Sequence, residues 1–281
     1  PGVPAEIRFT THTLRYAESA WVRVEGMARH WDRADVRARL GDDGALLTAE
    51  TVNVTAVSFP GVKSAAVVLD GERLASAPRY ERADGRWRAA AETAPEVLRK
   101  RPGLTGPVND AFMEPFVFVR PTGKPLNADV AGWVESELTA ARRLWRDVFR
   151  GEAPVKTDKE IGPDDLADRN LVLWGDPSSN AVLARIIGRL PVTWNAKTLV
   201  VHGRTHDAAT HAPILIFPNP LNPRRYVVIN SGVDFRAEGS GNNALQTPKL
   251  PDWAVVDLRT PADWRWPGKV VDAGFFDETW K

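Results

Sequence analysis

The sequence pattern changes near residue 113, and this change limits the folds that the chain can adopt. Before it, short runs rich in β-branched and aromatic residues alternate with turn residues, and in AWVRVEGM the valines alternate with charged residues. Short strands at such regular spacing are typical of two packed antiparallel sheets. The pair Asp70-Gly71 adds the signature of a tight hairpin. We therefore predict a β-sandwich domain over residues 1–93.

After the change, apolar strand-like runs alternate with helical stretches. The runs FVFVRP, LVLWG and RYVVINSG are almost unbroken, which suits a sheet covered on both faces. Residues 127–151 predict the clearest helix, with Asn127 as its cap and Gly151 at its end. Its apolar residues recur at helical period: Val130, Val134, Leu138, Ala141, Trp145 and Val148. We predict an α/β layered domain with a mostly parallel sheet over residues 113–281.

Between these regions lies a segment with the composition of a linker. Residues 94–112 contain several prolines and glycines together with the basic run Arg99-Lys100-Arg101. We interpret this run as a solvated part of the linker, and a binding patch is the alternative.

Composition excludes several classes of function. The net charge is only +1, with both signs interspersed, so nothing favours nucleic acid as a partner. The chain has no cysteine, which excludes disulfides, thiolate metal sites and a cysteine nucleophile. The longest apolar runs are far below the ~20 residues of a membrane helix. We expect no cofactor, and the opening Pro-Gly-Val-Pro, without Met, predicts processing or a longer parent chain.

The stretch NLVLWGDPSSNAVLARI, residues 170–186, has the outline of a strand, a tight turn and a helix. A serine nucleophile elbow has the same outline, but its Gly-x-Ser-x-Gly motif is absent from the whole chain, as is the phosphate-loop motif. The main interpretation is a helix start capped by Ser178 or Ser179. The alternatives are a substrate or anion contact that includes Asn180, and a nucleophilic Ser178 or Ser179.

A second candidate is the stretch HGRTHDAATH, which contains three of the five histidines. The spacing of four between His202 and His206 would place two zinc ligands on one helical face. The flanking runs are strand-like, however, and the glutamate of a zinc-protease helix is missing, so we predict no metal site. His211 could instead act as a general base, oriented by Asp176 or Asp207.

Polar residues at predicted strand ends form a third candidate. If the strands are parallel neighbours, Asn219, Asn230 and Ser231 line a crevice beside Ser178 and His211. The Asn-Pro pairs of this region are also ordinary turn residues, and that is the main interpretation. The eleven tryptophans would suit a sugar-binding face, although core packing is their commoner use.

Four segments resemble a known family. DAFMEPFVFVRPTGKPLN, NLVLWGDPSSNAVLARI, HDAATHAPILIFPNPLNPRRYVVINSG and GKVVDAGFFDETW are similar to the C-terminal region of bacterial, planctomycete-type, prolyl-oligopeptidase-like α/β-hydrolases. The opening FTTHTLRYAESAWVRVEGMARHW is similar to the segment that follows the hydrolase domain there. The resemblance implies a catalytic serine upstream of this chain, a parent serine peptidase or hydrolase, and a periplasmic or secreted location.

Three functional hypotheses follow. In the first, the chain is an accessory region whose partner is the upstream hydrolase domain of the same polypeptide, and it positions that domain or its peptide, ester or carbohydrate substrate. In the second, the chain is a hydrolase by itself, with Ser178 or Ser179, His211, and Asp176 or Asp207 as an atypical triad. In the third, it is a carbohydrate- or anion-binding module.

Overall fold

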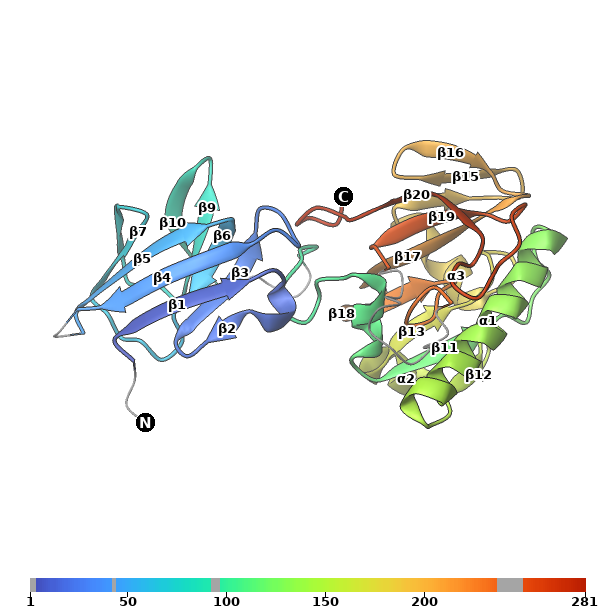
Figure 1. The fold of residues 1–281 in the computed structure, drawn as a ribbon, viewed down its shortest axis with the longest axis horizontal. Helices are drawn as coiled ribbons and strands as arrows, with labels where there is room; N and C mark the ends of the chain where they lie inside the picture. Colours follow the sequence, from blue (N-terminus) through green and yellow to red (C-terminus); the bar gives the residue numbers. More distant parts are fainter. Residues whose placement is uncertain (1–3, 42–43, 92–96, 237–249) are drawn as a thin grey trace. The chain divides into compact units, whose positions relative to one another are not determined.

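The computed structural model describes residues 4–41, 44–91, 97–236 and 250–281 (Figure 1). Of these residues, 40% lie in strands and 17% in helices, which confirms the prediction of a β-rich fold with several sheets. The chain divides into two compact units, Pro1–Thr105 with Asp277–Trp280, and Gly106–Phe276 with Lys281. Within the described ranges, no helix combines the length and apolarity that a membrane span requires.

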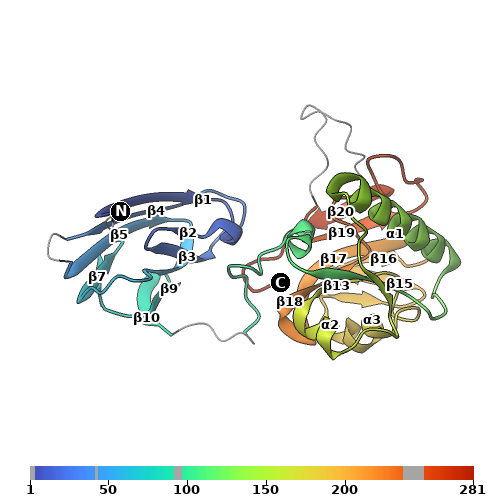
Figure 2. The same ribbon diagram turned by 90° about the horizontal axis from the view of Figure 1, so that it is seen from below.

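The first unit contains two five-stranded sheets, drawn as two layers in Figure 2. In one sheet the strand order is β1 (Glu6–Thr11), β4 (Ala34–Leu40), β5 (Leu46–Val52), β7 (Ala66–Leu69) and β8 (Glu72–Ala75). In the other the order is β10 (Arg86–Ala90), β9 (Arg79–Ala83), β6 (Val54–Ser58), β3 (Val22–Met27) and β2 (Glu18–Ser19). A short 3₁₀ helix, Leu14–Tyr16, lies between β1 and β2.

One hydrophobic core fills this unit, and both sheets contribute to it. Alternate residues of each strand point inward, so Val22 and Val24 of β3 join Leu47 of β5 and Trp87 of β10 in a single buried cluster. The hairpin predicted at Asp70-Gly71 is confirmed, because it joins the antiparallel strands β7 and β8. Asp70 and Gly71 both have positive φ, 47° and 86°, as a two-residue turn of this kind requires.

The segment Asp277–Trp280 belongs to the first unit although it comes from the far end of the chain. The Glu278 carboxylate accepts a hydrogen bond from the Thr55 hydroxyl at 2.7 Å. The backbone oxygen of Glu278 accepts another from Lys100 N at 2.8 Å. Gly26 makes room for Glu278, since a Cβ there would overlap the carboxylate. The Trp280 side chain is 1% exposed and lies under the Lys100 ammonium, 5.0 Å from it.

The second unit is built on a seven-stranded sheet. Its order is β12 (Val155–Thr157), β11 (Phe116–Arg120), β13 (Asn170–Leu173), β18 (Asn222–Ile229), β17 (His211–Asn219), β19 (Trp253–Asp257) and β20 (Lys269–Gly274). The first three pairings are parallel, and the last three are antiparallel. The prediction of a mostly parallel sheet is therefore wrong. Only two residues join Asn219 to Asn222, and so short a connection permits only antiparallel strands.

The helices of this unit cover both faces of the sheet. Helix α1 (Ala128–Phe149) lies on one face, while α2 (Pro163–Asp168) and α3 (Ala181–Ile186) lie on the other (Figure 2). Helix α1 connects β11 to β12, which is the outermost strand on that side of the sheet. Helix α2 connects β12 to β13 in the opposite direction, across β11. Crossovers between parallel strands are generally right-handed, and for two crossovers of the same hand, opposite directions along the sheet place the helices on opposite faces.

Helix α1 differs from its prediction at both ends. It starts after Asn127, whose side chain caps no helical amide and instead donates to the backbone oxygens of Ala196 and Ala208. Its last residue is Phe149, and Arg150 rather than Gly151 terminates it by adopting the left-handed conformation, with φ 59°. Val148, predicted on the apolar stripe, is 51% exposed.

Short elements complete the second unit. The strands β14 (Val192–Trp194), β15 (Thr198–Val201) and β16 (Arg204–Asp207) form a small antiparallel sheet. The 3₁₀ helices are Val108–Phe112 and Ile187–Arg189.

The segment predicted as a linker contains buried residues on both sides of the boundary between the units. Leu104, Thr105 and Val108 are each less than 5% exposed, and Lys100 is completely buried. The interpretation of the basic run as solvated is therefore wrong for Lys100. Its ammonium lies over the ring of Trp280, a residue from the far end of the chain, and the local sequence does not reveal this contact.

Candidate functional site

Several of the predicted site residues meet at one edge of the seven-stranded sheet. Strands β13 and β18 are parallel and end there, while β17 runs the opposite way and begins there. This edge therefore collects the turn after β13, Asn230 and Ser231 after β18, and His211 at the start of β17. Asn219 ends β17 and lies at the opposite edge. The expected crevice containing all of these residues does not form, because β17 and β18 are antiparallel.

The turn after β13 is held by the carboxylate of Asp176, which is 2% exposed. Its Oδ1 accepts hydrogen bonds from the backbone N–H groups of Ser178 and Ser179, both at 2.9 Å. Its Oδ2 accepts one from Leu126 N at 2.8 Å. One side chain thus accepts hydrogen bonds from three backbone N–H groups of a loop region. Buried N–H groups outside helices and strands need such a side-chain acceptor. Asp176 orients no histidine.

The two serines of the turn have different environments, and neither is held as a nucleophile would be. The Ser179 hydroxyl accepts from Asp176 N at 2.9 Å and lies 3.2 Å from Asp176 O, so it is used within the turn and is 4% exposed. The Ser178 side chain is exposed. Gly175, with φ 103°, is required beside Ser179, since a Cβ there would lie 2.5 Å from its hydroxyl oxygen.

Asn180, rather than either serine, caps the helix that follows. Its Oδ1 accepts from Val182 N at 3.0 Å and Leu183 N at 3.1 Å, as an N-cap side chain does. Its amide group donates to Val119 O and Trp174 O. The side chain is completely buried, so Asn180 locks α3 onto the ends of β11 and β13.

Asn230 and Ser231 are used in the same internal way. The Asn230 side chain accepts from Gly175 N at 2.8 Å and donates to Gly175 O at 3.1 Å, which ties the end of β18 to the turn after β13. Ser231 donates its hydroxyl to Gly232 O at 3.1 Å. Both residues are less than 5% exposed. Of these two candidate ligand contacts, Asn230 connects two loops and Ser231 is bonded within its own loop.

His211 begins β17 and is 8% exposed. Its Nδ1 lies 3.0 Å from both the backbone oxygen of Asp207 and the hydroxyl of Thr210. The Asp207 carboxylate does not reach the ring and instead accepts from Ala209 N at 3.0 Å. Strand β18 lies between β13 and β17. The backbones of the serine turn and of His211 are therefore at least two strand spacings apart, roughly 10 Å. In the described part of the chain, no serine hydroxyl is hydrogen-bonded to a histidine ring.

The remaining histidines of the cluster lie on a hairpin rather than on a helix. His202 occupies the turn between β15 and β16 with φ 46°, and its ring stacks on Trp253 at 5.2 Å. His206 lies in β16, with its ring 5.4 Å from that of His211, and burial followed by the charge of His211 lowers its pKa. Among the residues that the structure describes, no group of three or more His, Cys, Asp or Glu side chains could hold a metal ion.

Sequence reasoning missed a buried acid in the second unit. Glu137 lies on the inner face of α1, and its carboxylate is 2.8 Å from Arg236 Nε. Burial raises the pKa of Glu137 to about 7, although the Arg236 guanidinium opposes this shift. A cavity of about 630 Å³ lies nearby between α1 and Trp264. The helical period contained the signal, because Glu137 falls on the same stripe as Val134 and Leu138.

Comparisons with known proteins add no family to this picture. No protein-family model, no curated protein and no solved structure matches the chain.

Proposed function

We propose that this chain is a non-catalytic accessory region of a larger serine hydrolase of the prolyl-oligopeptidase-like kind. Its role would be to position the upstream catalytic domain of the same polypeptide or the peptide, ester or carbohydrate substrate of that domain. In this proposal the first unit is a β-sandwich and the second an α/β layered domain, as in the sequence prediction. A periplasmic or secreted location is part of the same proposal.

The observation that supports this proposal most strongly is the internal use of the polar groups in the turn after β13. Asp176 accepts three backbone hydrogen bonds, Ser179 is bonded within the turn, and Asn180 caps α3. A catalytic serine needs an exposed hydroxyl beside a base that is itself oriented by a third group. Asp176, Ser179 and Asn180 therefore already have structural functions, and the exposed Ser178 hydroxyl has no hydrogen bond to a histidine among the described residues.

The position of His211 supports the same conclusion against the alternative of a stand-alone hydrolase. Its Nδ1 contacts the backbone oxygen of Asp207 and the Thr210 hydroxyl, so this nitrogen has no carboxylate partner of the kind found in a catalytic triad. The one exposed serine of the turn, Ser178, has no histidine partner. A general base must reach the proton that it removes, directly or through one water, and the partners of His211 Nδ1 are a backbone oxygen and a threonine hydroxyl rather than a serine.

Hydrolysis assays test this proposal directly. The purified chain is mixed with p-nitrophenyl acetate and with a proline-containing fluorogenic peptide, beside a serine hydrolase as positive control. We expect rates equal to those of buffer plus an inert protein, and Ser178→Ala and Ser179→Ala variants identical to the parent. A turnover that one of these substitutions removes, in a variant that remains folded, would refute the non-catalytic assignment.

A further inference from the structure

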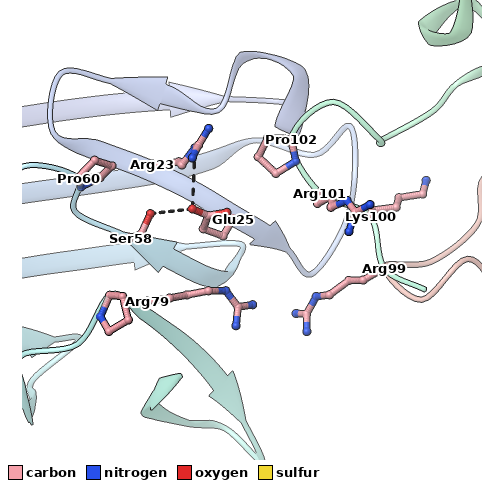
Figure 3. Close-up of a pocket in the computed structure, with 10 residues that line it drawn as sticks. Arg23, Glu25, Ser58, Pro60, Arg79, Arg99, Lys100, Arg101 and Pro102 are labelled. Carbon is pink, nitrogen blue, oxygen red and sulfur yellow. Dashed lines mark hydrogen bonds and ion pairs between the residues drawn. The ribbon is translucent and has the colours of Figure 1, made fainter. Parts of the chain in front are cut away.

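The first unit contains a cavity of about 420 Å³ that no functional hypothesis so far has used (Figure 3). Its size lies within the range of small-molecule sites. Strand β3 contributes Arg23 and Glu25, and β9 contributes Arg79. The other lining residues are Ser58, Pro60, Pro78, Arg99, Lys100, Arg101 and Pro102.

The lining of this cavity is strongly cationic. Five of its side chains are arginine or lysine, and Glu25 is the one acidic member among the lining residues. Acidic neighbours outside the lining anchor several of these cations: Glu18 pairs with Arg23, Glu81 with Arg79, and Glu278 with Arg99. Within the lining itself the cations outnumber the single carboxylate, which favours a negatively charged occupant.

Two guanidinium groups face each other across the lower part of the cavity, those of Arg79 and Arg99 (Figure 3). Glu81 holds Arg79 through Nη1 at 2.9 Å, and Glu278 holds Arg99 through Nη2 at 3.2 Å. A guanidinium carries five N–H donors, so each group keeps donors beyond these contacts. The Nε of Arg99 is buried and has no hydrogen-bond acceptor among the described residues.

Both guanidinium groups are held in place by the fold. The Arg79 side chain is only 7% exposed, and the Glu278 carboxylate that holds Arg99 is itself bonded to Thr55. Like charges that are fixed face to face repel each other, and an anion between them removes that repulsion. Guanidinium forks match the oxygens of carboxylate and phosphate groups, to which they bind in bidentate fashion.

The charge of Lys100 also acts on a partly buried histidine of this unit, His30. Burial and, to a smaller extent, the charge of Lys100 lower the pKa of His30 to about 4, while the charge of Asp277 opposes this shift. Lys100 is completely buried, so its charge is poorly screened by solvent.

Another part of the cavity has a different chemistry. The Ser58 hydroxyl donates to the Glu25 carboxylate at 2.7 Å, and Arg23 Nε lies 3.8 Å from the same carboxylate (Figure 3). A carboxylate repels an anion but accepts hydrogen bonds from hydroxyl groups. An occupant that is anionic at one end and hydroxylated at the other matches both parts of the lining.

We propose that this cavity binds a small organic anion, with its carboxylate or phosphate group between Arg79 and Arg99 and its hydroxyl groups towards Ser58 and Glu25. The proposal goes beyond the accessory function, because it assigns the first unit a ligand of its own. It requires no catalysis, and the accessory function does not depend on it.

Isothermal titration calorimetry of the full chain tests this proposal with four probes: inorganic phosphate, glucose 6-phosphate, malate and, as the uncharged control, glucose. We expect saturable binding of glucose 6-phosphate or malate, weakened by added salt, and no binding of glucose. The tighter of the two anions identifies the phosphate or carboxylate preference. Arg99→Gln should weaken that binding at least about tenfold, since it removes a charged hydrogen-bond donor.

A matched control is available on the same strand pair. Arg88 also pairs with Glu81 but lies outside the cavity and is 64% exposed, so Arg88→Gln should leave binding unchanged. Arg79→Lys keeps the positive charge but loses the paired N–H donors of the guanidinium. It should weaken anion binding while circular dichroism shows the fold intact. Absence of saturable binding by every anion would overturn the proposal. Equal affinity of the folded Arg99→Gln variant and the parent would also overturn it.

Discussion

Replacing Asp176 with alanine is expected to lower the free energy of unfolding of the second unit by about 3–4 kcal/mol. The substitution removes the acceptor of three backbone N–H groups, those of Ser178, Ser179 and Leu126. The carboxylate is 2% exposed, so water does not readily replace it, and each stranded donor costs about 1–3 kcal/mol. Urea unfolding of the purified variant, followed by far-UV circular dichroism, measures the change.

Asp207 provides the matched control for this prediction, because sequence reasoning gave both residues the same candidate role. Its carboxylate is exposed and accepts a single backbone hydrogen bond, from Ala209 N. Asp207→Ala should therefore cost no more than about 1 kcal/mol. If Asp176→Ala unfolded at the urea concentration of the parent chain, the carboxylate would not hold the turn, and the structural interpretation of this turn would be wrong.

Replacing Trp280 with alanine is expected to destabilise the first unit by about 3–5 kcal/mol, the usual cost of deleting a buried tryptophan side chain. Trp280 is 1% exposed, and its ring supports the buried Lys100 ammonium. Removing the ring leaves a cavity and takes away the cation–π contact of a charge that is out of water. Hydrogen exchange read by mass spectrometry on peptides from β3 and β6 measures the effect within the first unit.

The same experiment contains its own controls. Peptides from β13 and β18 belong to the second unit, and their exchange rates should change less than those of β3 and β6. Tyr16→Ala removes an aromatic residue of the first unit that is 70% exposed, and it should leave exchange close to that of the parent. Unchanged protection of β3 and β6 in Trp280→Ala would mean that Asp277–Trp280 does not stabilise the first unit.

Local patterns predicted individual elements well where the pattern itself carries the physical cause. Asp70-Gly71 predicts its hairpin because both residues tolerate positive φ. The apolar stripe predicts α1 because one face of that helix is buried. The sheet direction was missed although its signal was present, since the two residues between Asn219 and Asn222 are too few for a parallel crossover.

The candidate sites show where such reasoning ends. Sequence predicted the helix start after β13 but gave its cap to a serine, because Ser178, Ser179 and Asn180 all have suitable side chains and only the backbone geometry selects Asn180. The basic cavity of the first unit could not be predicted from the sequence. Its lining joins Arg23, Arg79 and Arg99, which lie on separate segments, and no local spacing connects them.

The central claim, that none of the serines in the described ranges is activated as a nucleophile, is tested most directly with a fluorophosphonate. The intact mass of the purified chain is measured after treatment, beside a serine hydrolase of known reactivity, and any adduct is located by peptide mapping. The account predicts an unmodified chain and a fully labelled control. Stoichiometric modification of Ser178, Ser179 or Ser231 would contradict it, because only a serine activated by a base reacts in this way.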